Sequence, residues 1–277
     1  MYLKHFGLVE LPFGITPDTS FVYSLQCHQE ALNTLLLALA GGEGFVKISG
    51  EVGTGKTLLC RRLLQTLGED WVTAYLPNPR LDAVTLFQAL AEELGVAEPA
   101  RPDQYYWLRA INQTLLDFAR AGKRVAVLID EAQAMPLETL EALRLLSNLE
   151  TEKQKLLHII LFGQPELDDK LSRPEIRQLL QRIAFHYRLA GLGRRELGNY
   201  VAHRLRVAGY LGEGLFSPGA LRALHRASGG TPRLVNILAH KALLAVYGEG
   251  RQTVKVRHVR QAGRDTEGAK NVGWLWG

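Results

Sequence analysis

Apolar residues between positions 44 and 189 fall into two kinds of pattern, short continuous runs and stripes with helical spacing. The continuous runs predict buried strands, because a parallel strand is covered on both faces. They cover residues 44–49, 71–76, 124–130, 156–162 and 184–189. Helical spacing covers residues 58–67, 82–94, 103–120 and 136–149. This alternation predicts an α/β fold with a parallel five-stranded sheet and helices on both faces.

Strand patterns end near residue 193, and three helical segments follow at residues 194–207, 217–227 and 231–247. Ser217-Pro218 and Thr231-Pro232 each place a cap residue before a proline at the first helical position. We therefore expect three regions. An α/β domain would cover residues 1–192, a small all-helical domain residues 193–250, and a basic C-terminal tail residues 251–277.

The most informative motif is Gly-Glu-Val-Gly-Thr-Gly-Lys-Thr at residues 50–57, which matches the loop that wraps the phosphates of a nucleotide. Its glycines let backbone N–H groups approach phosphate oxygens, the lysine can reach the β- and γ-phosphates, and the threonine can bind Mg²⁺. A chance match is the alternative, but a predicted strand precedes the loop and a predicted helix follows it. The expected binding residues are Gly50, Glu51, Val52, Gly53, Thr54, Gly55, Lys56, Thr57 and Leu58.

An acidic pair, Asp130-Glu131, ends the most apolar strand. Open α/β sheets bind ligands beyond the carboxyl ends of their strands, which is where this pair should lie. Asp130 would then help Thr57 to hold Mg²⁺, and Glu131 would act as a general base toward water. The alternative is an acidic loop without a function.

Gln164 follows the next buried strand and could orient water or contact a γ-phosphate, although a turn before a helix also fits. Arg233 lies in the first turn of a predicted helix, where the helix dipole disfavours a cation. An anionic partner such as a γ-phosphate would explain it; an ordinary surface arginine is the alternative.

Three further arginines, Arg173, Arg177 and Arg182, lie between Gln164 and the fifth strand. One of them could reach the nucleotide of a neighbouring subunit as an arginine finger, and Arg182 is the first choice, with Arg177 second. The alternative is that they are solvated arginines on a helix face.

Charge is distributed unevenly along the 277 residues. Residues 1–150 carry 12 Lys/Arg and 18 Asp/Glu, whereas residues 151–277 carry 21 and 10. The basic half is compatible with nucleic-acid binding, with solvated or nucleotide-binding arginines, or with a head-to-tail oligomer of unlike halves.

No run of 18 apolar residues and no signal-peptide pattern occurs, and Cys27 and Cys60 lack metal-ligand spacing. We expect a cytoplasmic protein without a membrane span of its own.

The order of these motifs resembles that of the AAA+ ATPases, a class of P-loop NTPase, and within them the ExeA/GspA group. The resemblance is most marked to the MshM-type proteins of the mannose-sensitive haemagglutinin pilus system, and it covers roughly residues 1–265. Its further motifs are His5-Phe-Gly-Leu8, Pro12-Phe-Gly-Ile-Thr-Pro-Asp18, Gly44-Phe45, Ile129-Asp-Glu-Ala-Gln133, Gly163-Gln-Pro-Glu-Leu167, Gln181-Arg-Ile183, Tyr200, Arg204-Leu205, Ala208-Gly209 and Gly230-Thr-Pro-Arg233.

The resemblance implies an ATP- and Mg²⁺-dependent ATPase that forms a ring or helical homo-oligomer. Gln164 would be the first sensor, Arg233 the second, and Arg182 the finger. Residues 11–24, with Tyr23, would line the adenine site, and the helical domain would be a lid. Proteins like ExeA continue into a membrane span and a peptidoglycan-binding domain, whereas this sequence stops at Gly277, so we do not expect it to bind the cell wall directly. We therefore expect a partner to provide any contact with the inner membrane.

Three functions fit these observations. The first is an ATPase that supports assembly of a type IV pilus or secretion system. The second is a DNA-binding AAA+ regulator of the transposition or replication-initiator type, which the basic half favours. Against it, no winged-helix or helix-turn-helix domain fits after Gly250. The third is a nucleotide-dependent scaffold. The first is favoured, because a chain that only binds ATP needs no base at Glu131.

Overall fold

The computed structural model describes residues 2–14, 26–97, 103–146, 148–150 and 155–270. Its internal contacts divide the chain into two compact units. The sheet unit is Cys27–Glu51 with Lys56–Leu189, and the helical unit is Met1–Gln26, Val52–Gly55 and Ala190–Gly277. This grouping differs from the expected boundaries, because the first residues join the C-terminal helices.

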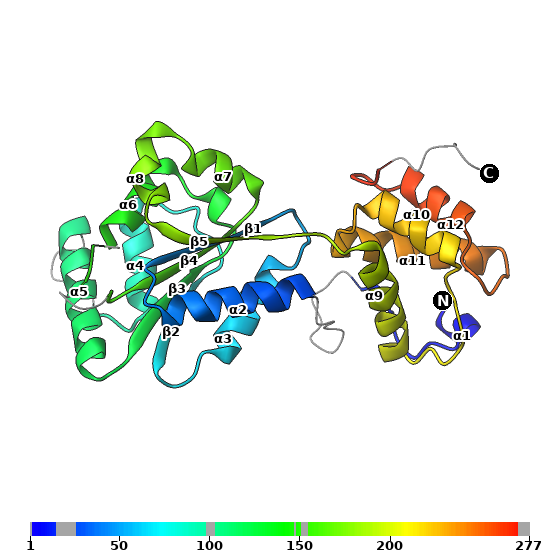
Figure 1. Ribbon diagram of the computed structural model, residues 1–277, viewed down its shortest axis with the longest axis horizontal. Helices are drawn as coiled ribbons and strands as arrows, with labels where there is room; N and C mark the ends of the chain where they lie inside the picture. The colour runs from blue at the N-terminus through cyan, green and yellow to red at the C-terminus, as the bar shows by residue number, and fades with distance from the viewer. Residues whose placement is uncertain (1, 15–25, 98–102, 147, 151–154, 271–277) are drawn as a thin grey trace. The chain divides into compact units, whose positions relative to one another are not determined.

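The sheet unit contains the parallel sheet (Figure 1). Its strands are β1 (Phe45–Gly50), β2 (Trp71–Leu76), β3 (Arg124–Ile129), β4 (His158–Gly163) and β5 (Ile183–Leu189). They lie in the order β2-β3-β4-β1-β5, and every neighbouring pair is parallel. The five strands predicted from the apolar runs are therefore confirmed, and all five carboxyl ends point to one edge of the sheet.

Two apolar clusters cover the two faces of this sheet, because alternate residues of a strand point to opposite faces. Val127 and Ile129 of β3 face a cluster built with the helices between residues 83 and 120 and between residues 137 and 180. Ala126 and Leu128 face a second cluster built with the helices at residues 26–40 and 56–66. Figure 1 shows the two sets of helices on opposite sides of the sheet. Helices on both faces were predicted, and both faces are covered.

The helices of the sheet unit follow the predicted order, but one is shorter than expected and three were not predicted. The bounds are α2 (Gln26–Ala40), α3 (Lys56–Thr66), α4 (Ala83–Glu93), α5 (Gln104–Arg120), α6 (Leu137–Leu146), α7 (Pro165–Leu171) and α8 (Arg177–Leu180). The Asp82 and Asp103 side chains accept hydrogen bonds from the Thr85 and Tyr106 backbone N–H groups, as expected of N-caps. The helix expected at 136–149 is shorter, and α2, α7 and α8 were not predicted.

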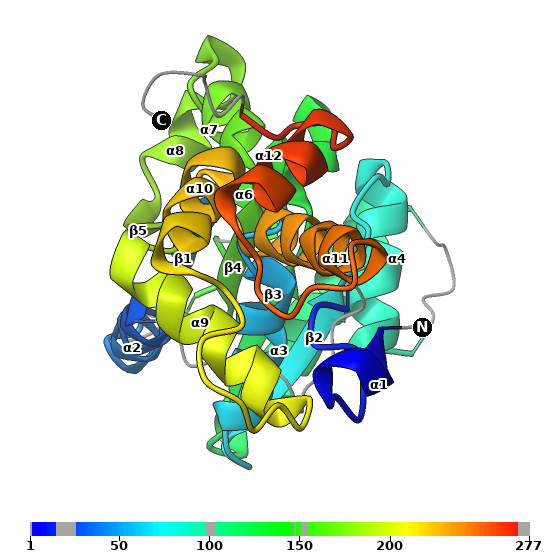
Figure 2. The same ribbon diagram turned by 90° about the vertical axis from the view of Figure 1, so that its right-hand side faces the viewer.

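The helical unit contains α1 (Leu3–Phe6), α9 (Arg194–Val207), α10 (Pro218–Ser228), α11 (Pro232–Gly248) and α12 (Val256–Arg264), all labelled in Figure 2. The last of these lies where a basic tail was expected. Val259 and Ala262 of α12 are buried, and α12 packs against α10 and α11. This segment is therefore part of the folded unit, because its few apolar residues recur at helical spacing and face the core.

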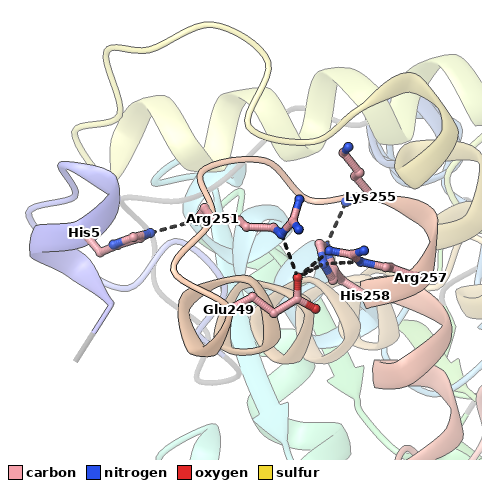
Figure 3. A network of polar contacts seen from close by, with 6 residues as sticks. All are labelled: His5, Glu249, Arg251, Lys255, Arg257 and His258. Atoms are coloured by element: carbon pink, nitrogen blue, oxygen red, sulfur yellow. Dashed lines mark hydrogen bonds and ion pairs between the residues drawn. The ribbon is translucent and has the colours of Figure 1, made fainter.

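Glu249, just after α11, is the centre of the polar network in Figure 3. Its Oε2 accepts from Arg251 Nε at 3.2 Å, and it also pairs with Arg257. The fully buried His258 ring lies 3.3 Å from the same oxygen through Nε2, while its Nδ1 accepts the Lys255 backbone N–H. One carboxylate thus joins the end of α11 to the start of α12.

The N-terminal segment packs on the helical unit through buried polar groups. Tyr2 donates or accepts a 2.9 Å hydrogen bond with His240 of α11. Arg204 of α9 donates from Nε to the Pro12 carbonyl, and Asn236 of α11 donates to the Gly14 carbonyl at 3.3 Å. Buried guanidinium and amide groups require such partners, so these contacts fix the backbone of residues 12–14.

Among the described residues, no helix is both long and apolar enough to cross a membrane.

Candidate active site

The loop between β1 and α3 carries the predicted phosphate-binding motif. Gly53 and Gly55 adopt φ angles of 80° and 94°, a left-handed conformation that only glycine adopts without strain. Lys56 begins α3 and is 5% exposed. Its ammonium group donates to the Gly50 carbonyl at 2.7 Å and to the Glu51 carbonyl at 3.1 Å. The lysine side chain therefore lies folded against its own loop.

Burial is the main influence on the charge of Lys56. It lowers the pKa of this ammonium group below 10.5, and the carboxylates of Glu131, Asp130, Glu51 and Glu166 oppose the shift. These four carboxylates are close enough to act on the ammonium group. A buried cation in a cluster of anions is an arrangement that can receive a polyanionic ligand, because the ligand adds opposite charge where the ammonium has lost water.

Thr57 and Asp130 come from different elements and meet directly. The Thr57 hydroxyl, in the first turn of α3, donates to Oδ2 of Asp130 at 2.6 Å. Asp130 follows β3 and is 3% exposed, and its Oδ1 accepts the Glu131 backbone N–H at 2.9 Å. The two side chains expected to hold Mg²⁺ therefore meet, although one lies at the start of α3 and the other directly follows β3.

Glu131 has an unusual backbone, with φ 51° and ψ 36°. It is the one non-glycine residue with positive φ in the part of the chain that the structure describes. Such a conformation costs on the order of 1 kcal/mol for a residue with a Cβ atom, so the surroundings must hold it in place. A short 3-10 helix, Ala132–Ala134, follows, and its Ala134 N–H donates to the Glu131 carbonyl at 2.8 Å.

Two glutamine amides contact the carboxylate of Glu131. Gln164, which follows β4, donates from Nε2 to Glu131 Oε2 at 3.0 Å. Gln133 donates to the same oxygen, and its own Oε1 accepts the Gln164 backbone N–H at 3.0 Å. Glu131, Gln133 and Gln164 therefore form a closed triangle across the ends of β3 and β4. Adjacent parallel strands explain why residues 31 and 33 positions apart meet here.

Gln133 is the last residue of the motif at residues 129–133, but the sequence alone assigned it no role. Its amide bridges the Glu131 carboxylate to the Gln164 backbone N–H. A polar residue two positions after a candidate catalytic carboxylate, close to the end of a buried strand, is the signal that could have identified it.

The remaining predicted residues lie elsewhere. Arg182 precedes β5 and is partly exposed, and Arg177 begins α8 and is exposed. Arg233 is exposed in the first turn of α11, and its backbone N–H lies 3.4 Å from the Gly53 carbonyl, both within the helical unit. Tyr23 lies outside the described residues. Of the proposed adenine segment 11–24, only residues 11–14 are described, and they pack on the helical unit.

Comparison with known proteins relates the chain to a family. A family model described as "AAA domain" matches residues 39–171. General secretion pathway protein A of Aeromonas hydrophila is 41% identical over 273 residues, which is 99% of this chain. The chain belongs to the AAA+ ATPases, in the group of that protein. It spans 50% of the length of this relative.

Solved structures of other AAA+ proteins share the fold of the chain at low identity. The ORC2 protein of Aeropyrum pernix, solved as ADPNP-ADP complexes, has a TM-score of 0.63 and 18% identity, covering 93% of this chain and 74% of that one. Cdc6p of Pyrobaculum aerophilum has a TM-score of 0.65 and 18% identity over 90% of this chain and 71% of its own. The fold predicted from the sequence, an AAA+ sheet followed by helices, is confirmed.

Proposed function

We propose that the chain binds ATP with Mg²⁺ and hydrolyses it, and that this activity supports assembly of a type IV pilus or secretion system. The observation that carries the proposal is the convergence of four side chains at the carboxyl edge of the sheet: Lys56, Thr57, Asp130 and Glu131. An ammonium, a hydroxyl and two carboxylates beside a glycine-rich loop are the groups that phosphoryl transfer needs.

The donor set suits a magnesium nucleotide. A hydroxyl and a carboxylate oxygen 2.6 Å apart are hard ligands, and few direct protein ligands are typical of Mg²⁺. Thr57 and Asp130 would hold the ion, which when bound would neutralise charge on the phosphates. The carbonyls that now accept from Lys56 would give up its ammonium group to the phosphate oxygens. Residues Gly50 to Leu58 would supply backbone N–H groups to the same oxygens.

Glu131 would polarise the attacking water, and Gln164 would orient it or contact the γ-phosphate. The 3.0 Å contact between their side chains supports these roles, since a water molecule that reaches one is within reach of the other. Arg233 would act as the second sensor, and Arg182, or else Arg177, would serve a neighbouring subunit as the finger. Tyr23 remains a proposed adenine contact.

The cellular role rests on the relative. General secretion pathway protein A supports a place in secretion, and the MshM-type resemblance supports a type IV pilus. We place the chain in the cytoplasm, associated with the inner membrane through a partner, as a ring or helical homo-oligomer. Shared active sites follow from this arrangement, because the finger of one subunit would complete the site of the next.

The steady-state ATPase rate, measured against protein concentration, tests the proposal. Specific activity should rise cooperatively as subunits assemble, and high salt should weaken the effect if unlike charges meet at the interface. A specific activity that stays flat over the concentration range would contradict shared sites. Absence of ATP turnover at every concentration would contradict the proposed function.

A DNA-binding AAA+ regulator is the second candidate, favoured by the charge of residues 151–277. In this case duplex DNA should raise the ATPase rate many-fold even where the basal rate is low. Binding should also weaken steeply with salt, because lysines and arginines release counterions from the phosphates. An ATPase rate indifferent to DNA would remove this candidate.

A further inference from the structure

The helix α7 begins immediately after Gln164 and contacts two other segments of the proposed active site. It is packed very closely at its start: a Cβ atom placed on Gly163 would lie 2.5 Å from Leu167 Cδ2. Leu167 and Leu171 are both fully buried on the same side of the helix. The position of α7 is therefore tied to the end of β4 and hence to Gln164.

Asp168 joins α7 to the strand that enters the phosphate loop. Its Oδ1 accepts from the Lys47 ammonium group of β1 at 2.6 Å, and the Lys47 side chain is only 6% exposed. A buried lysine holds its partner firmly, because losing it leaves an unpaired charge away from water. This contact links α7 to the strand three residues before Gly50.

Lys170, on the same helix, reaches the loop that carries Glu131. Its ammonium group donates to the Gln133 carbonyl at 2.5 Å and to the Met135 carbonyl at 2.8 Å. These carbonyls lie at the end of the 3-10 helix that follows Glu131, where backbone acceptors lack partners in the helix. A cation is stabilised at such a C-terminal end, so Lys170 caps this turn.

Two observations indicate what this cap holds. The left-handed Glu131 directly precedes the capped turn, and Gln133, whose carbonyl Lys170 binds, contacts both Glu131 and Gln164. Burial lowers the pKa of Lys170, with the charge of Arg173 acting in the same direction. The two carbonyls that accept from the ammonium group offset part of this desolvation.

We propose that Lys170 is a positioning residue for ATP hydrolysis, which holds the Glu131 carboxylate in register with Gln164 by capping the acidic loop. The inference rests on the proposed function. Lys170 touches neither phosphate nor water in this role. Its effect reaches the reaction through the backbone of residues 131–135.

The test compares the wild type with Lys170→Met, Lys170→Arg and a control, Lys123→Met. Lys123 is exposed and lies just before β3, at the opposite end of this strand from Asp130. The measurements are kcat, the Kd for ADP measured without turnover, and the urea midpoint of unfolding. Each Lys170 variant is also combined with Glu131→Gln.

Lys170→Met is expected to lower kcat by between about tenfold and a hundredfold, the effect of a small misplacement of a catalytic group. The Kd for ADP should stay within about twofold, and Lys170→Arg should recover most of kcat, because a guanidinium can reach the same carbonyls. Combined with Glu131→Gln, Lys170→Met should cost less than about twofold, since the carboxylate it positions is gone. The control should match the wild type.

Several results would overturn the proposal. They are an unchanged kcat in Lys170→Met, a parallel loss of ADP affinity and urea midpoint, no recovery by arginine, or a full additional loss in the Glu131→Gln background. If Lys170→Met does not fold, Lys170→Gln, which keeps one donor, should give a kcat between the wild type and Glu131→Gln. A wild-type kcat in that variant would also overturn it. Full turnover by Glu131→Gln alone contradicts the proposed function instead.

Discussion

The Thr57 hydroxyl donates a 2.6 Å hydrogen bond to Asp130 Oδ2, which joins residues 73 positions apart. Thr57 lies at the start of α3 and Asp130 directly follows β3, and α3 packs in the same apolar cluster as Ala126 and Leu128 of β3. This contact gives the first of four predictions about the proposed site.

Replacing Thr57 by valine removes the hydroxyl while keeping a branched side chain of similar volume. We expect Mg²⁺-dependent ATP affinity to fall by at least about tenfold, since a ligand and a hydrogen bond to a carboxylate are both lost. Thr57→Ser should retain most of the affinity. Thr66→Val, at the other end of the same helix, is the control. Equal ATP affinities of Thr57→Val and this control would show that the hydroxyl is not a ligand.

Glu131→Gln keeps the size of the side chain and removes its basicity. Turnover should fall by about 10²- to 10⁴-fold, the usual contribution of a general base, while ATP still binds. Single-turnover hydrolysis and equilibrium binding of ATP measure the two effects separately. Glu138→Gln, exposed in the first turn of α6, should behave as the wild type. A variant at position 131 with normal turnover would rule out the base.

ATP binding should be coupled to uptake of a proton by Lys56. In the free protein, burial lowers the pKa of its ammonium group below 10.5. A bound triphosphate favours the charged form and so raises this pKa, which means that part of the lysine population gains a proton on binding in the alkaline range below 10.5. ATP affinity should therefore decrease as pH rises through that range.

Calorimetric titration of ATP in buffers with different ionisation enthalpies measures this uptake. Lys56→Met should lack the part of the proton uptake that is due to this lysine. A proton count that is independent of pH in the wild type would contradict the coupling.

The Lys47–Asp168 pair should respond unequally to loss of either partner. Asp168→Ala leaves the nearly buried Lys47 ammonium group unpaired, and we expect it to cost about 3 kcal/mol of unfolding free energy. Lys47→Met leaves Asp168, whose side chain is 31% exposed and can be hydrated, so its cost should be smaller by at least about 1 kcal/mol. Urea unfolding followed by tryptophan fluorescence, to which the buried Trp107 contributes, measures both. Equal losses would contradict this account.

Sequence reasoning located the sheet well because buried parallel strands have a distinctive composition. The strand predicted at residues 71–76 has these bounds in the structure, and all five strands occur. The same reasoning expected Asp130 and Glu131 to lie beside the phosphate loop, since carboxyl ends of parallel strands share one edge. Local sequence patterns are enough to place a residue when that residue directly follows a buried apolar strand.

Other features depend on partners that are far away in the sequence. Nothing near Gln133 indicates that its amide contacts Gln164, and nothing near Lys170 indicates carbonyl partners 35 and 37 positions earlier. The helix α12 was missed because its polar surface dominates the composition of residues 251–270. Residues 2–14 were assigned to the α/β region, whereas Arg204 and Asn236 bind their backbone in the helical unit.

At position 131, the proposed catalytic role and the stability of the backbone favour different residues. Glycine adopts this conformation without strain and asparagine adopts it readily, so either residue at 131 would relax the loop while removing the carboxylate. A lineage that needed only nucleotide binding could thus gain stability by losing hydrolysis in one step. The proposed general base therefore carries a backbone cost that a residue serving nucleotide binding alone would not need to carry.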